Sequence, residues 1–114
     1  MNSIMYRVEI QLLNGFKIDD AWVEAVEHLL PIYGSYDQDD LNETSAVFKF
    51  GSEVRVSAFK EECVKKLLNC VPGIYYVDVE YIYYGEFTPD RFVMWNDGRC
   101  AEFTGKVIYT EDPK

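Results

Sequence analysis

Strict alternation of apolar and polar residues along positions 4–13 predicts a first β-strand. One face of this strand would pack into the core, and its members are Ile4, Tyr6, Val8, Ile10 and Leu12. Asn14-Gly15 is a turn-forming pair and ends the strand.

The next segment, residues 20–30, spaces its apolar side chains as a helix does. Asp19 or Asp20 can cap this helix, and Pro31 limits it to about residue 30. The predicted apolar stripe is Trp22, Ala25, Val26, Leu29 and Tyr33. Residues 33–43 are rich in turn formers and acids, which predicts a surface loop.

Alternation resumes over residues 45–58 and predicts a hairpin that turns at residues 51–53. This register sets Phe50 opposite Val54 and makes one face apolar throughout, whereas a two-residue turn would not. A second helix would start at Ser57 and end at Val71-Pro72-Gly73. Its predicted inward side chains are Phe59, Cys63, Leu67 and Leu68.

Residues 74–84, IYYVDVEYIYY, hold five of the chain's nine tyrosines and predict another strand. One row can join the core and consists of Tyr75, Val77, Val79, Tyr81 and Tyr83. The other row mixes aromatic rings with two carboxylates and consists of Ile74, Tyr76, Asp78, Glu80, Ile82 and Tyr84.

This order of elements predicts an α+β fold of ferredoxin-like type, a split βαβ sandwich with the order βαββαβ. Its antiparallel sheet would have the spatial order 4-1-3-2, with two helices on one face. We expect one domain, residues 1–114, in which 1–85 form the core and 86–114 form a C-terminal hairpin extension and tail. The hairpin, RFVMW-NDG-RCAEF, turns near Asp97-Gly98 and is followed by a short strand, KVIYT.

The helices leave the other face of the predicted sheet open, and two interpretations of it stay open as well. Either the C-terminal hairpin folds over this face as part of the core, or the face binds another chain. Asp78 and Glu80 argue against RNA, because base-stacking platforms of this topology need neutral or positive neighbours.

Charge favours a protein as the partner. The formal net charge is −9, and no Lys or Arg occurs between Lys17 and Lys49. Such a surface repels nucleic acid and anionic membranes and attracts basic proteins. Acidity that serves only solubility is the alternative.

Several features predict a cytoplasmic protein. No apolar run approaches the roughly 20 residues of a membrane span, and residues 1–13 do not resemble a signal peptide. Three cysteines cannot all pair, and Cys63 and Cys70 would lie too far apart on one helix for a disulfide. We expect both to be small buried hydrophobic residues, with a reactive thiol as the alternative.

No pattern of catalytic or metal-binding residues is recognisable. His28, the single histidine, falls on the polar face of its helix, and zinc and nucleotide motifs are missing from the sequence. The acidic stretch DQDDLNE lacks the glycine and the final glutamate of a calcium loop. We therefore predict no catalytic residue, no cofactor and no metal.

Three short segments carry a resemblance to a known family: Pro72-Gly73-Ile74-Tyr75, Asp90-Arg91-Phe92-Val93-Met94-Trp95 and Glu111-Asp112-Pro113. With the predicted order of elements, the chain resembles small acidic immunity proteins of bacterial polymorphic, contact-dependent toxin systems. The resemblance implies a non-enzymatic antidote that binds a toxin, often a basic nuclease, and blocks its active cleft.

We therefore predict a protein-binding inhibitor, of toxin-immunity or phage counter-defence type, that docks an acidic, aromatic-containing face on a basic partner. The alternative is a regulatory domain that senses a small ligand or forms a homodimer through the open sheet face. The predicted partner-binding residues are Tyr36, Asp37, Asp39, Asp40, Glu43, Tyr76, Asp78, Glu80 and Tyr84.

Overall fold

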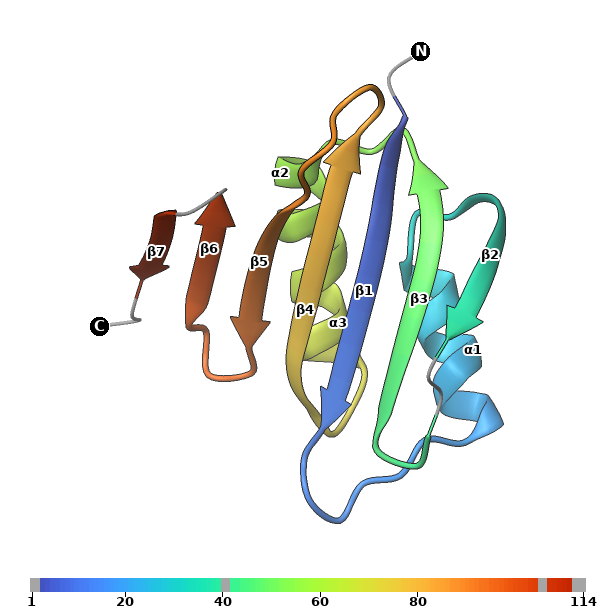
Figure 1. Cartoon of the computed structure of the whole chain (residues 1–114). Helices are drawn as coiled ribbons and strands as arrows, with labels where there is room; N and C mark the ends of the chain where they lie inside the picture. The colour runs from blue at the N-terminus through green and yellow to red at the C-terminus, as the bar shows by residue number, and fades with distance from the viewer. Residues whose placement is uncertain (1–2, 40–41, 105–106, 112–114) are drawn as a thin grey trace.

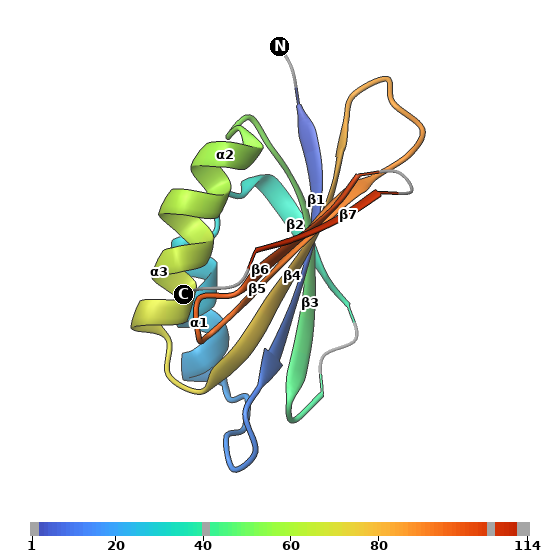
Figure 2. The same cartoon turned by 90° about the vertical axis from the view of Figure 1, so that its left-hand side faces the viewer.

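The computed structural model describes residues 3–39, 42–104 and 107–111, with side chains described for 3–32 and 42–103. Within these residues the strands form one antiparallel sheet in the order β2-β3-β1-β4-β5-β6-β7 (Figure 1). The strands are β1 (Ile4–Leu12), β2 (Tyr33–Asp39), β3 (Ser45–Ser52), β4 (Ile74–Tyr83), β5 (Asp90–Trp95), β6 (Cys100–Thr104) and β7 (Val107–Glu111). The helices lie on one side of the sheet, so the predicted α+β class is confirmed (Figure 2).

The core lies between the sheet and the helices, and β1 runs through its centre. Alternate residues of β1 are buried, as the sequence predicts, because one row faces the helices. Tyr6 on this row packs its ring 4.5 Å from that of Phe59 and 5.6 Å from that of Phe50, centroid to centroid. Its hydroxyl donates a hydrogen bond to the Val54 carbonyl at 2.6 Å, so the polar end of this ring is satisfied.

Helix α1 spans Asp20–Leu29, close to the predicted bounds. Asp19 is the N-cap, since its side chain accepts a hydrogen bond from the Trp22 N–H at 2.8 Å. Trp22 and Val26 face the core. Ala25, predicted to be on the same stripe, is exposed.

The second helix consists of α2 (Val56–Ala58), a π-helical segment η1 (Phe59–Val64) and α3 (Lys65–Cys70). A π-turn holds one residue more than an α-turn, so Val64 follows Phe59 into the core in place of Cys63. Cys63 is half-buried and packs against the edge of the core, so its predicted burial is confirmed only in part. The predicted burial of Cys70 is wrong, because Cys70 is exposed.

Two predictions for residues 33–58 are wrong. Residues 33–39 form β2, an edge strand against β3, and are not part of a loop. Residues 54–58 do not return as a strand, because β2 and β1 already occupy both edges of β3. The short alternating run after Glu53 instead leads into the second helix, which begins at Val56.

Gly73 joins α3 to β4 with a left-handed backbone, φ +82°. A Cβ placed there would lie 2.3 Å from Cδ1 of Phe16, so Gly73→Ala combines backbone strain with a steric clash. We expect it to lower the free energy of unfolding by about 2–4 kcal/mol in urea titrations.

Gly85→Ala is the matched control, since Gly85 has φ +90° and a Cβ added there would meet no other part of the described chain within 4 Å. This control should lose only about 1 kcal/mol, the cost of the backbone conformation alone. Equal losses for the two variants would show that the contact with Phe16 does not matter.

Candidate functional site

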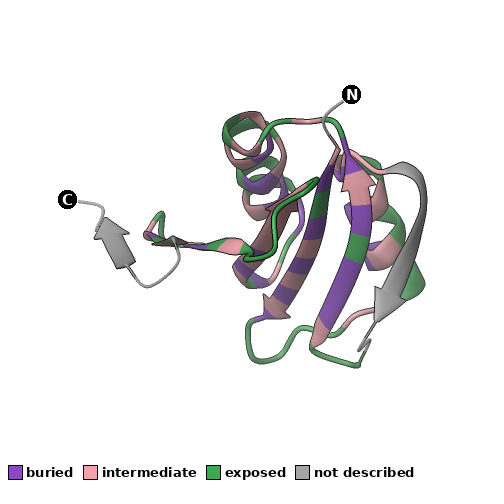
Figure 3. Ribbon diagram, turned by 45° about the horizontal axis from the view of Figure 1, so that its top comes forward, coloured by how far each residue is buried: buried purple, intermediate pink, exposed green. Residues whose placement is uncertain are grey.

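Among the described residues, the helices lie on one side of the sheet and leave its other side uncovered (Figures 2 and 3). The strand β5 pairs with β4 and so extends this side of the sheet. Of the two interpretations of the hairpin, folding over the face is wrong for the described residues, because its strands extend the sheet. We call this surface the open face and define it by Met5, Arg7, Glu9, Lys49, Tyr76, Asp78, Glu80, Ile82 and Arg91.

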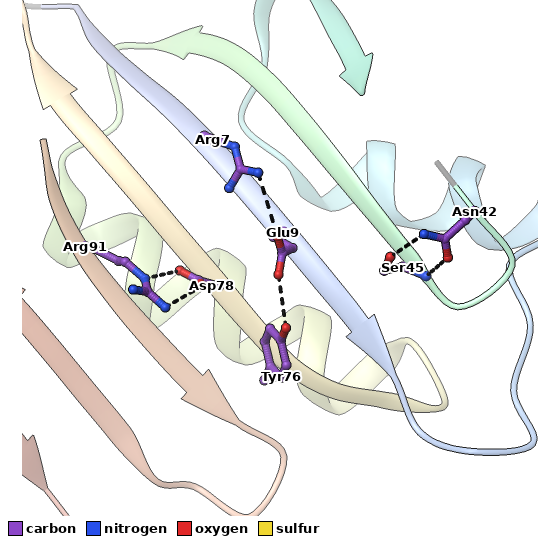
Figure 4. Close-up of polar contacts among 7 residues, drawn as sticks. All are labelled: Arg7, Glu9, Asn42, Ser45, Tyr76, Asp78 and Arg91. Carbon is purple, nitrogen blue, oxygen red and sulfur yellow. Dashed lines mark hydrogen bonds and ion pairs between the residues drawn. The ribbon is translucent and has the colours of Figure 1, made fainter. Parts of the chain in front are cut away.

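Arg91 and Asp78 form a bidentate ion pair on the open face (Figure 4). The guanidinium donates through Nε and Nη2 to the two carboxylate oxygens, both at 2.8 Å. Asp78 is well covered, with 15% of its side chain exposed, and the Arg91 guanidinium lies 4.8 Å from the centroid of the Phe103 ring. The hydrogen bonds to Asp78 raise the pKa of Arg91 above its ordinary value, although burial opposes this shift.

Glu9 holds the second polar group of the open face together. Its Oε2 accepts a hydrogen bond from the Tyr76 hydroxyl at 3.0 Å, and its Oε1 lies 3.7 Å from Nη2 of Arg7 (Figure 4). Glu9 also lies directly opposite Asp78 in the strand register, an unfavourable pairing of like charges. The two carboxylates coexist because each has its own donors.

Burial and the hydrogen bond to Glu9 raise the pKa of Tyr76 to about 12. Since this folded-state pKa lies above the ordinary value of 10.0, its stabilising contribution is complete below pH 10 and is lost as the pH rises through about 12. Glu9→Gln should lower the pKa of Tyr76, because it removes the negative charge beside the phenol. The tyrosine Cζ resonance of Tyr76, followed by NMR against pH, measures this change.

Glu24→Gln is the control variant, because Glu24 is an exposed carboxylate on α1, on the other side of the sheet from Tyr76. It should leave the midpoint of Tyr76 unchanged. A Tyr76 midpoint that does not move in Glu9→Gln would contradict the assigned hydrogen bond.

Among the nine residues that define the open face, charge is balanced. Three bases (Arg7, Lys49 and Arg91) stand against three acids (Glu9, Asp78 and Glu80) among its defining residues. The strand beyond β3 is β2, whose register sets Asp37 opposite Lys49 and Asp39 opposite Val47. Other acids lie away from the open face, for example the exposed Asp20 and Glu24 of α1.

The structure places the predicted site residues in three groups. Tyr76, Asp78 and Glu80 lie together on the open face, and Tyr84 follows the end of β4 with 87% of its surface exposed. Glu43 is exposed between β2 and β3, with its carboxylate 3.7 Å from Nζ of Lys17. Tyr36, Asp37 and Asp39 belong to β2, where side chains are not described, and Asp40 lies outside the described residues.

One end of the open face is apolar. Met5, Ile82 and Pro89 line a shallow hollow of about 160 Å³, and Met5 is 52% exposed. Tyr84 lies in the connection that leaves β4 at this end.

Six residues of the open face were not among the predicted site residues: Met5, Arg7, Glu9, Lys49, Ile82 and Arg91. Alternation along residues 4–13 indicates the first three, alternation along residues 45–58 indicates Lys49, and alternation along residues 74–84 indicates Ile82. Arg91 requires knowledge of where β5 pairs, which no local pattern supplies.

Histidine, tyrosine and cysteine are side chains that can take part in catalysis. His28 is exposed on α1, with its Nε2 3.8 Å from Oε1 of Glu24. No cluster of three or more metal-ligating side chains occurs among the described residues. Burial raises the pKa of Tyr6, Tyr81 and the Cys63 thiol, which moves each of these groups further from titration at neutral pH.

Comparisons with protein-family models, curated proteins and solved structures found no match to this chain. The resemblance to immunity proteins therefore stays a prediction. In the part of the chain that the structure describes, no helix is both long enough and apolar enough to cross a membrane.

Proposed function

We propose that this chain is a non-enzymatic protein-binding inhibitor that docks the open face of its sheet on a basic partner protein. The observation that carries the proposal is a wide sheet face without a covering layer, on which charged side chains are already held in place. Arg91, Asp78 and Glu9 already have hydrogen-bond partners in the free chain. Docking therefore costs less side-chain entropy than it would on a surface whose side chains are mobile.

The apolar end of the face supplies the anchoring contacts in this proposal. Tyr84 and Met5 are large and exposed, and aromatic side chains dominate the binding energy of many interfaces. Beside them the hollow lined by Ile82 and Pro89 can accept an apolar side chain of the partner.

The acidic excess of the chain supplies the steering. With a net charge of −9, the molecule accelerates encounter with a basic protein at low ionic strength. Because the nine residues that define the open face are balanced in charge, long-range charge would govern the association rate and the anchoring contacts would govern the dissociation rate. We keep Asp37, Asp39, Asp40 and Glu43 as the candidates for steering.

We further propose that β1 to β4 and the two helices form a ferredoxin-like split βαβ sandwich, with the C-terminal hairpin as its extension. The order β4-β1-β3-β2 and the placement of the helices on one side support this assignment. A toxin-immunity or phage counter-defence role in the cytoplasm agrees with the acidic composition and with the resemblance of the segments at 72–75 and 90–95.

Affinity capture from the native host tests the proposal. The immobilised chain should retain a basic protein at about 50 mM NaCl and lose most of it at about 500 mM, because salt screens the steering charges. The pair Asp39→Lys and Asp40→Lys should weaken capture, whereas His28→Gln on α1 should not. If neither salt nor the two substitutions to lysine changed the amount of captured protein, the proposal would be contradicted.

The homodimer alternative is distinguished by sedimentation. Two copies that each carry −9 repel one another, so we expect a monomer up to about 100 µM at low salt. A dimer that forms in this range and is broken by Tyr84→Ala would replace the inhibitor proposal.

A further inference from the structure

One cavity among the described residues lies on the side of the sheet that carries the helices, away from the open face (Figure 2). It measures about 320 Å³ and is bounded by the start of α1, the end of α3 and the loop that joins β1 to α1. Leu12, which β1 contributes, belongs to the buried row that faces the helices. The volume falls within the range of small-molecule sites.

The wall of this cavity is mainly apolar. Leu12, Trp22 and Val71 contribute buried side chains, and Ala25 contributes an exposed methyl group from α1. Phe16, in the loop, also lines the cavity and keeps 44% of its surface exposed. An apolar ligand would remove these surfaces from water, so the wall favours a ligand with an apolar body.

The charged side chains of the wall favour a neutral ligand. The lining that the structure describes contains one base, Lys17, and one acid, Asp19. Nζ of Lys17 lies 3.7 Å from Oε2 of Glu43, and the Asp19 carboxylate accepts the backbone N–H of Trp22 at 2.8 Å as the helix cap. Both charges therefore have a partner, and an ionic ligand would lose its hydration in an apolar cavity without compensation.

The indole N–H of Trp22 is the polar group that distinguishes this cavity. Trp22 is 7% exposed, and its Nε1 is the single buried side-chain nitrogen or oxygen in the described part of the chain without a hydrogen-bond partner. A buried donor that has no acceptor destabilises the folded chain. Since Trp22 is part of the cavity wall, a ligand that occupies the cavity can supply the acceptor oxygen.

We propose that this cavity binds a small neutral carbonyl compound, whose oxygen accepts a hydrogen bond from the Trp22 indole and whose apolar body packs against Leu12 and Val71. A carbonyl group fits the wall because it accepts a hydrogen bond and brings no donor of its own that would remain unpaired. The inference is independent of the protein-docking function, because it concerns the helix side of the sheet. A ligand of about a dozen heavy atoms should bind with a Kd of roughly 1 mM.

Three probes of similar size test this chemistry: 4-phenyl-2-butanone, 3-phenylpropionate and 4-phenylbutan-2-amine. In NMR titrations of the full chain, the ketone should shift the indole N–H resonance of Trp22 downfield. The indole resonance of Trp95, the chain's other tryptophan, should stay in place, because Trp95 lies on β5 and outside the cavity lining. The ketone should bind at least about 10-fold more tightly than either charged probe.

Filling the cavity should abolish binding. Ala25→Phe places a ring in the cavity from an exposed position of α1, so the ketone should no longer shift the Trp22 resonance. Glu24→Phe introduces the same side chain at the adjacent exposed position, which is not part of the lining, and should leave the titration unchanged.

Trp22→Phe removes the donor and keeps an aromatic ring, so it should weaken binding of the ketone by about 10-fold, as followed through the backbone amides of α1. If this variant proves too unstable, the comparison of Ala25→Phe with Glu24→Phe decides, because both retain Trp22. Equal binding of the three probes, a Trp22 shift that survives in Ala25→Phe, or no shift with up to about 10 mM ketone would each overturn the proposal.

Discussion

Replacing Phe59 by alanine should lower the free energy of unfolding by about 3–5 kcal/mol, the largest loss that we expect from a single core substitution. Phe59 is 0% exposed, and its ring lies 4.5 Å from that of Tyr6 and 6.2 Å from that of Phe50. Removing it leaves a cavity at the point where the helix, β1 and β3 meet. Urea unfolding followed by circular dichroism measures the loss.

Phe87→Ala is the matched control, because Phe87 is 97% exposed and should change stability by less than about 0.5 kcal/mol. The free energy of unfolding of a domain of this size is about 5–15 kcal/mol, so the Phe59→Ala variant can be unfolded even without urea. Phe59→Leu, with an expected loss of about 1–2 kcal/mol, then supplies the measurable variant. Similar losses for Phe59→Ala and Phe87→Ala would refute the assigned core.

Replacing Tyr84 by alanine should weaken partner binding by about 30-fold or more, which corresponds to the roughly 2 kcal/mol of an interface hot spot. Stability should barely change, since 87% of Tyr84 is exposed in the free chain. Most of the loss should appear as faster dissociation in surface plasmon resonance with the captured partner.

His28→Ala controls for a general effect of truncation, since His28 lies on α1 on the other side of the sheet. It should leave the dissociation rate within about 2-fold of the parent. If Tyr84→Ala and the parent chain bound the partner equally well, the apolar end of the open face would not be part of the interface.

The sequence predicts those elements whose signal is local. Alternation over residues 4–12 indicates β1, and Asp19 with Pro31 brackets α1 closely. The strand β2 could not be predicted in this way, because YGSYDQD lacks alternation and its pairing with β3 has an irregular register. Its strand conformation depends on the edge that β3 offers, which is a tertiary effect.

The second helix shows a different limit. Regular 3.6-residue spacing predicts Cys63 as a core residue, but the π-turn shifts the buried face by one position to Val64. A similar shift occurs in β4. Alternation alone predicts that Tyr75 is buried and Ile74 is not, but the irregular pairing of β1 with β4 between Gln11 and Leu12 buries Ile74 and exposes Tyr75.

The sequence predicts which residues of the tyrosine strand share the candidate site, but it does not predict the charge of the site. Alternation along residues 74–84 places Tyr76, Asp78 and Glu80 on one face, as the structure has them. The bidentate contact of Asp78 with Arg91 depends on how β5 aligns with β4, and no local pattern encodes that alignment. With Arg91 included, the nine residues that define the open face hold equal numbers of acids and bases.

Site-specific photo-crosslinking tests the central claim, that the open face docks a partner protein, most directly. A benzoylphenylalanine would be introduced in turn at Met5, at Tyr84 and at His28, three exposed positions of which the first two lie on or beside the open face. After irradiation in the native host, Met5 and Tyr84 should each give the same single adduct with a basic protein, and His28 should give none. Adducts formed only at His28, or none at Met5 and Tyr84, would contradict the account.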